Sequence, residues 1–125
     1  MKYIIATHGK MASGIKNTIE MLTGKKEDIY ALDAYVETQE LRKEFEKLLA
    51  TCDGEGIYVF TDIVSGSVNQ EICRFLERPH FHVITGVNLP LIMELVFRNE
   101  NLSDEEIMSI VEEAKDQIIY MNKMS

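Results

Sequence analysis

The chain opens with Met1-Lys2-Tyr3-Ile4-Ile5-Ala6-Thr7-His8-Gly9, a short apolar run that stops at a histidine and a glycine. A run of this kind, followed by a helical pattern, predicts a buried parallel strand that leads through a turn into a helix. Side chains at the carboxyl end of such a strand face the crevice in which open α/β sheets bind ligands. Imidazole is the side chain best suited to take or hold charge near neutral pH, so His8 is the first candidate functional residue.

Strand and helix patterns alternate along the rest of the chain. Further strands are expected at residues 29–32, 56–61 and 81–85. This alternation predicts an α/β fold in which about four strands form an open, mostly parallel sheet flanked by helices. The order 2-1-3-4, as in flavodoxin-like sheets, would bring the ends of strands 1, 3 and 4 into one crevice. Gly24 is expected to end the first helix, and Ser103-Asp104-Glu105-Glu106 is expected to begin the fifth as a capping box. Helices are predicted from five apolar stripes, formed by Ile15, Thr18, Ile19 and Leu22; Leu41, Phe45, Leu48 and Leu49; Val68, Ile72, Phe75 and Leu76; Leu91, Ile92, Leu95 and Val96; and Ile107, Ile110, Val111, Ala114 and Ile118.

Bulk composition narrows the class of protein. With 125 residues, 46% of them hydrophobic and 27% charged, the chain is expected to form one domain over residues 1–125. The net charge of −8 and the pI of about 4.8 argue against a nucleic-acid or anionic-membrane partner. Neither a signal peptide nor a spanning segment is expected, and Cys52 and Cys73 suit a reduced, cytoplasmic protein.

Polar side chains follow three of the four predicted strands. Thr7-His8-Gly9 ends the first, Asp62 follows the third together with Ser65-Gly66-Ser67, and Gly86-Val87-Asn88 follows the fourth. Neighbouring strands could bring Asp62 within hydrogen-bonding distance of His8, where a carboxylate would fix the ring tautomer. A Ser/Gly turn before a helix offers backbone amides and hydroxyls to a phosphoryl group. Together they predict an activated histidine facing a phosphate pocket.

The same residues are also compatible with other interpretations. Asp62 alone could be a cap, and Ser-Gly-Ser is common in turns. The segment 9–16 lacks the Lys-Ser/Thr of a nucleotide phosphate loop, and no dinucleotide fingerprint or nucleophile elbow occurs. Asp62 could be a phosphoacceptor aspartate of the receiver type only if an acidic group stood at the end of the first strand, where this chain has Thr7-His8. A metal site would need at least one further ligand, and the sequence offers no obvious one. His80 and His82 flank the fourth strand near its amino end, where structural or solvent-facing roles are expected.

Over essentially its whole length the chain resembles the IIA components of the mannose-type (mannose, fructose and sorbose) sugar phosphotransferase system (PTS). The resemblance rests on Thr7-His8-Gly9, Asp62 with Ser65-Gly66-Ser67, and Gly86-Val87-Asn88-Leu89-Pro90. It implies a cytoplasmic phosphotransferase component that is a homodimer and works without metal or organic cofactor. Its phosphodonor would be the histidine phosphocarrier protein HPr and its acceptor an EIIB component, acting with the membrane components EIIC and EIID.

The resemblance also implies residue roles. His8 matches the phosphorylated histidine, Asp62 the aspartate that orients its ring, and Ser67 the serine beside the phosphoryl group. The family commonly has glycine where this chain has Ser65, and often proline where it has Val68. Two alternatives stay open: the phosphocarrier subunit of the PTS-dependent dihydroxyacetone kinase, and a non-catalytic regulatory or dimerisation module on the same fold.

Overall fold

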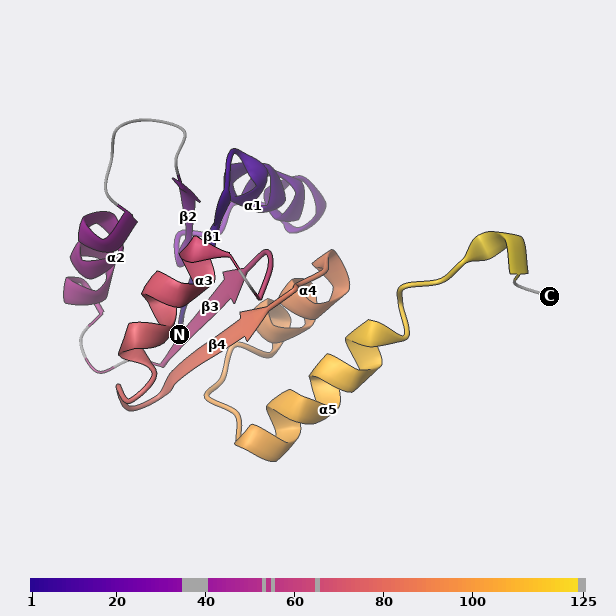
Figure 1. Ribbon diagram of the computed structural model, residues 1–125. Helices are drawn as coiled ribbons and strands as arrows, with labels where there is room; N and C mark the ends of the chain where they lie inside the picture. Colours follow the sequence, from indigo (N-terminus) through magenta and orange to yellow (C-terminus); the bar gives the residue numbers. More distant parts are fainter. Residues whose placement is uncertain (35–40, 53, 55, 65, 124–125) are drawn as a thin grey trace. The chain divides into compact units, whose positions relative to one another are not determined.

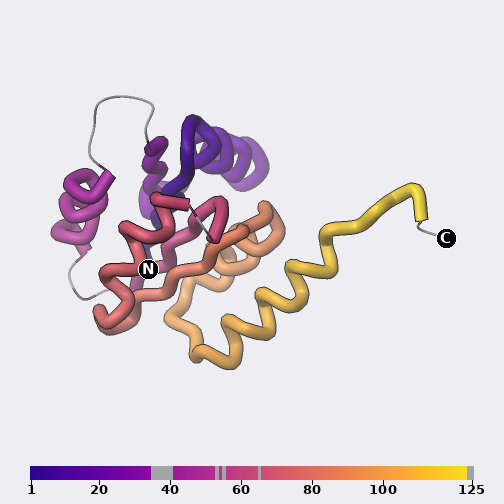
Figure 2. Tube along the Cα trace, viewed as in Figure 1, coloured from indigo at the N-terminus to yellow at the C-terminus, as the bar shows by residue number. Residues whose placement is uncertain are grey.

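A computed structural model of the chain describes residues 1–34, 41–52, 54, 56–64 and 66–123. The chain divides into two compact units, Met1–Val87 and Asn88–Ser125. Within the described residues, the first unit contains the sheet and three α-helices, and the second contains two further α-helices (Figures 1 and 2). Among the described residues, no helix is both long and apolar enough to cross a membrane.

The first unit is organised around a four-stranded sheet (Figure 1). Its strands β1 (Lys2–His8), β2 (Ile29–Ala34), β3 (Ile57–Thr61) and β4 (Phe81–Thr85) pair in parallel, in the order β2-β1-β3-β4. The predicted α/β class, parallel sheet and strand order are therefore confirmed. Because the chain leaves β1 for β2 on one side and later returns to β3 on the other, the topological switch point lies between β1 and β3.

Helices lie between consecutive strands along the chain, as expected for a parallel sheet. α1 (Met11–Thr23) joins β1 to β2, α2 (Leu41–Ala50) precedes β3, and α3 (Ser67–Ile72) precedes β4. α1 ends where predicted, since Gly24 takes a φ of 89° and its amide bonds the Glu20 carbonyl. The third helix is shorter than the apolar stripe suggested, because residues 73–75 form a 3₁₀ turn.

The core of the first unit explains which helix faces are buried. Ile4 and Ala6 of β1 and Val59 of β3 pack with apolar residues of α2 and α3 on one face of the sheet. In that core Phe45 of α2 lies 5.2 Å, centroid to centroid, from Phe75. In α1, Ala12 and Ile19 are the buried residues, whereas Leu22, which was expected to continue the buried stripe, is exposed.

The second unit is an antiparallel pair of helices, α4 (Leu89–Arg98) and α5 (Asp104–Lys115). The predicted capping box is present: the Ser103 hydroxyl accepts from the Glu106 amide, and the Glu106 carboxylate accepts from the Ser103 amide. α5 ends before Ile118, which was expected to face inward and is exposed. A 3₁₀ turn, Met121–Lys123, follows.

Candidate functional site

His8 and Asp62 meet at the carboxyl ends of β1 and β3, as their sequence positions predict. β1 and β3 are paired neighbours whose last matched residues are Ala6 and Thr61. The Asp62 carboxylate oxygen Oδ2 lies 2.9 Å from His8 Nδ1 and also accepts the backbone N–H of His8 at 3.0 Å. Two contacts to one oxygen fix both the position and the rotation of the imidazole.

Solvent reaches the two side chains unequally. The His8 side chain is 38% exposed, whereas that of Asp62 is 13% exposed. Desolvation by burial opposes ionisation of Asp62, but the hydrogen bonds from the His8 amide, the His8 ring and the Asp62 amide outweigh it and lower the pKa of the carboxyl group. At neutral pH the site therefore pairs a carboxylate with a ring open to an approaching reactant.

This arrangement sets the chemistry available to His8. A carboxylate accepts but does not donate, so the neutral ring places its proton on Nδ1 and its lone pair on Nε2. The same carboxylate stabilises the imidazolium that forms when Nε2 attacks an electrophile. His8 is therefore arranged as a nucleophile, with Asp62 as its orienting and charge-stabilising partner.

The Ser65-Gly66-Ser67 segment borders this ring through Gly66. A Cβ added at Gly66 would lie 2.7 Å from His8 Cε1, which means that the glycine backbone touches the ring. Because Cε1 is bonded to Nε2, the loop flanks the predicted nucleophilic nitrogen. Ser67, the first residue of α3, is exposed at that helix end, and Ser65 lies outside the described residues.

Sequence reasoning missed how α1 is held behind this site. The hydroxyl of Thr7, which is fully buried on β1, accepts the Ala12 amide at 2.7 Å. The carboxylate of Asp33 on β2 accepts the Ser13 amide at 2.9 Å. Both bonds satisfy amides in the first turn of α1, and so anchor the helix that follows His8. The sequence signal that could have revealed this role is Thr7, a polar residue at the end of an apolar strand.

Asn69 is a further residue whose role the sequence interpretation missed. It is buried on α3 between the apolar Val68 and Ile72, and its side chain bonds to both β3 and the loop before the helix. An amide inside an apolar helical stripe was the signal that could have revealed it.

Two residues of the Gly86-Val87-Asn88 segment after β4 form hydrogen bonds that stabilise the fold. The Val87 amide donates to the Thr61 carbonyl at the end of β3. Asn88 begins the second unit, where its side chain accepts the Leu91 amide and donates to the Ala114 carbonyl. Its functional groups thus cap α4 and tie it to the end of α5.

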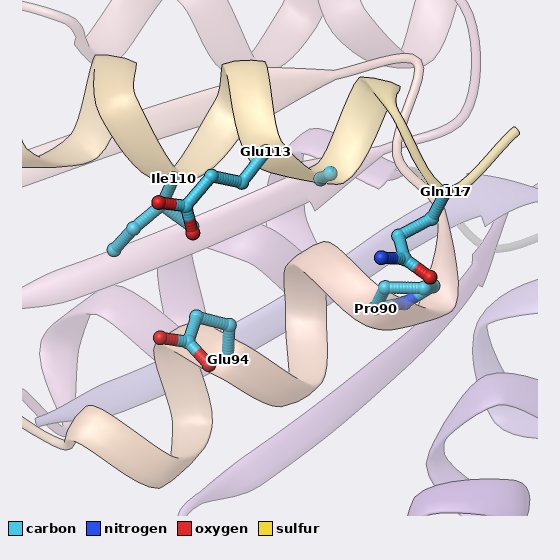
Figure 3. A pocket seen from close by; sticks show the side chains of 6 residues that line it. Pro90, Glu94, Ile110, Glu113 and Gln117 are labelled. Atoms are coloured by element: carbon cyan, nitrogen blue, oxygen red, sulfur yellow. The ribbon is translucent and has the colours of Figure 1, made fainter.

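A pocket between α4 and α5 is lined by none of the residues that the sequence predicted for the site. Figure 3 shows Glu94 and Glu113 directed into it beside Pro90 and Gln117. Within the part of the chain that the structure describes, no three His, Cys, Asp or Glu side chains gather in a way that could hold a metal ion.

Known proteins are similar to this chain in sequence and in fold. A family model described as EIIA-man, PTS system fructose IIA component, matches residues 2–114. The chain is 30% identical over 115 residues to the mannose-specific EIIAB component of the PTS of Escherichia coli (strain K12), an alignment covering 88% of this chain and 36% of that protein. It therefore spans about a third of the length of that relative.

Two further matches cover nearly all of both chains. The sorbose-specific EIIA component of the PTS from Lacticaseibacillus casei is 22% identical over 121 residues, covering 94% of this chain and 87% of that protein. A crystal structure assigned to a phosphoenolpyruvate-dependent sugar PTS permease from Klebsiella pneumoniae subsp. pneumoniae superposes with a TM-score of 0.89 at 42% identity, covering 98% and 91% of the two chains.

Proposed function

The chain belongs to the EIIA-man family of the sugar phosphotransferase system, and we propose that it accepts a phosphoryl group on His8 from phospho-HPr and transfers it to an EIIB component. Family membership supports the broader role of a phosphocarrier and phosphotransferase component. The observation that carries the specific proposal is the 2.9 Å contact between His8 Nδ1 and Asp62 Oδ2 at the switch point of the sheet.

Phosphoryl transfer to His8 would proceed in line. The lone pair on Nε2 attacks the phosphorus of the donor phosphohistidine, a new N–P bond forms, and the electron pair of the broken bond stays on the donor imidazole. The His8 ring becomes a phosphorylated cation whose Nδ1–H remains bonded to the Asp62 carboxylate. In the second step an EIIB side chain attacks the same phosphorus and the electron pair returns to Nε2.

The loop beside the ring would hold the phosphoryl oxygens. Gly66 lets the backbone approach Cε1 without a Cβ, and the amides of the first turn of α3 follow it. Ser67, whose hydroxyl could also bond to the phosphoryl group, is an exposed residue at the same turn. We assign Ser65, Gly66 and Ser67 to phosphoryl binding and His8 with Asp62 to the transfer itself.

Protein partners fit the surface around the site. Ile63 and Val64, in the loop that carries Asp62, are exposed apolar side chains, which is typical of a protein-docking surface when they adjoin a reactive group. The net charge of −8 favours a basic phosphodonor. The exposed apolar run Ile118-Ile119-Tyr120-Met121 would be covered in a homodimer.

We also propose that residues 1–125 make up one EIIA domain that works in the cytoplasm with EIIC and EIID. The family model supports this extent, since its match over residues 2–114 includes segments of both compact units. Cys52 and Cys73 are free thiols, as the reducing cytoplasm maintains them.

A phosphotransfer assay tests the proposal. The protein is incubated with phosphoenolpyruvate, the general phosphotransferase proteins and HPr, and the modified residue is located by mass spectrometry at alkaline pH. We expect an acid-labile phosphohistidine at His8 that is lost when an EIIB protein is added. Absence of label would support the non-catalytic module, and transfer only to a dihydroxyacetone kinase complex would support the other alternative.

A further inference from the structure

Asn69 is a buried amide in an otherwise apolar part of α3. It is 8% exposed, and its helix neighbours Val68 and Ile72 lie in the core formed with α2. A buried amide is costly unless its donors and acceptor are bonded. The partners that Asn69 has therefore indicate what it is there to hold.

Besides the Cys73 thiol, which donates to Oδ1 from the next turn at 3.8 Å, the side chain of Asn69 has two partners, and these lie on the two sides of Asp62. The Nδ2 group donates to the Val64 carbonyl at 3.1 Å, and Oδ1 accepts from the Thr61 hydroxyl at 3.1 Å. Thr61 is the fully buried last residue of β3, whereas Val64 lies in the loop with its side chain 70% exposed. One side chain thus ties the end of the strand to the middle of the loop.

The loop has few other supports within the described residues. The Ile63 amide donates to Asp62 Oδ1 at 3.1 Å, and the Gly66 amide reaches the Ile63 carbonyl at only 3.4 Å. Yet this loop must place the Asp62 carboxylate 2.9 Å from His8 Nδ1 and the Gly66 backbone against His8 Cε1. Its conformation consequently determines both contacts of the ring.

We propose that Asn69 is a positioning residue for phosphoryl transfer at His8, acting through the loop that holds Asp62 and Gly66. The inference rests on the proposed phosphocarrier function and adds to it a residue that never touches the phosphoryl group. Asn69 fastens the loop between Thr61 and Val64, so that the orienting carboxylate and the glycine wall reach the imidazole together.

Kinetics of the Asn69→Ala variant provide the first test. Because small misplacements of a reacting group slow transfer strongly, we expect the single-turnover rate from phospho-HPr to fall about 10- to 100-fold, with KM for phospho-HPr nearly unchanged. Gln70→Ala is the matched control, since it removes an exposed amide from the next position of the same helix. An Asn69→Ala rate within twofold of the Gln70→Ala rate would overturn the proposal.

The ¹⁵N spectrum of the imidazoles separates positioning from general destabilisation. In Asn69→Ala the His8 Nδ1 resonance should move toward that of a histidine without a carboxylate partner. The His82 resonance should stay in place, because that ring is stacked on Tyr58 within the sheet. Unchanged His8 shifts in a folded Asn69→Ala variant would contradict the proposed role.

A second variant, Thr61→Val, tests the proposal if Asn69→Ala does not fold. Thr61→Val keeps the side-chain volume and removes the donor to Asn69 Oδ1, so we expect the same His8 shift change at smaller amplitude and a rate lower by several-fold. If Asn69→Ala does not fold, an unchanged Thr61→Val spectrum overturns the inference. If the wild-type protein takes no label at all, the proposed function fails, and the spectra still decide whether Asn69 positions His8.

Discussion

Two histidines of one sheet show how position decides what a residue can do. His8 is the last residue of β1, at the carboxyl end of the sheet, where its ring meets the Asp62 carboxylate. His82 is the second residue of β4, and its ring stacks on Tyr58 with centroids 4.8 Å apart. Tyr58 in turn stacks on Tyr3, so His82 ends a row of three rings across β1, β3 and β4.

The difference comes from the geometry of parallel sheets. At their carboxyl ends the strands diverge into loops and helix starts, so a side chain there meets polar groups and solvent. Inside a strand the neighbouring positions of paired strands face one another, and aromatic rings pack. The same imidazole is therefore oriented for chemistry at one place and used as a packing group at the other.

Replacing each histidine by alanine should separate these roles most strongly. His8→Ala removes the nucleophile, so phosphohistidine labelling from phospho-HPr should be abolished while the protein stays folded. His82→Ala should keep a labelling rate within about threefold of wild type and lose about 1–2 kcal/mol of unfolding free energy, because it loses ring packing. Labelling and urea unfolding measure the two effects, and labelled His8→Ala would contradict the site assignment.

Adding one methyl group at Gly66 should disturb the carboxyl-end site without touching the ring row. The new Cβ would fall 2.7 Å from His8 Cε1 and 2.9 Å from Ile63 Cγ1, so the loop, the Ile63 side chain or the imidazole must shift and the packing around the ring changes. We expect Gly66→Ala to slow transfer about 100-fold. Gly14→Ala is the control: its Cβ would meet nothing within 4 Å inside α1, and it should raise stability by about 0.5–1 kcal/mol. Equal transfer rates for the two variants would show that the ring does not need its present place.

Removing the charge of Asp62 tests whether its carboxylate stabilises the positive charge that forms on the His8 ring. Asp62→Asn should slow transfer about tenfold or more, since a neutral amide stabilises the phosphorylated imidazolium less well. The folded-state pKa of Asp62 is lowered from its ordinary 3.8, so its carboxylate stabilises the fold above that ordinary value, and this contribution is lost as pH falls through the lowered pKa.

Unfolding of wild type and Asp62→Asn by urea, followed from neutral pH into the acid range, measures that contribution. The wild-type advantage should be constant at neutral pH and shrink only in acid. An advantage that grows as the pH falls would contradict the direction of the shift.

The smallest effect on phosphoryl transfer is expected from a substitution among the exposed apolar residues beside the site, Ile63 and Val64. Val64→Ser should raise KM for phospho-HPr about threefold, because one exposed valine contributes little buried area to an interface. Leu22→Ser is the matched control, as Leu22 is similarly exposed (62% against 70% for Val64) but lies near the far end of α1. Steady-state kinetics with both variants give the comparison, and equal KM values would remove Val64 from the docking surface.

Much of the fold followed from local patterns. Alternating strand and helix signals gave the four strands, and the glycine at position 24 and the Ser103–Glu106 box marked helix ends correctly. The expectations for Leu22 and Ile118 were wrong for one physical reason. Apolar spacing at Leu22 and Ile118 suggested buried faces, but whether an apolar side chain is covered depends on neighbouring elements that the local sequence does not specify.

The sequence by itself determined that a histidine and an aspartate end two strands, and that a Ser/Gly turn follows. Only the tertiary structure decided that β1 and β3 are neighbours, that one Asp62 carboxylate oxygen contacts both the backbone amide and the ring Nδ1 of His8, and that Gly66 lies against the ring. Asn69 illustrates the reason most directly. Its identity is local, but its function depends on hydrogen bonds that exist only after strand, loop and helix have packed together.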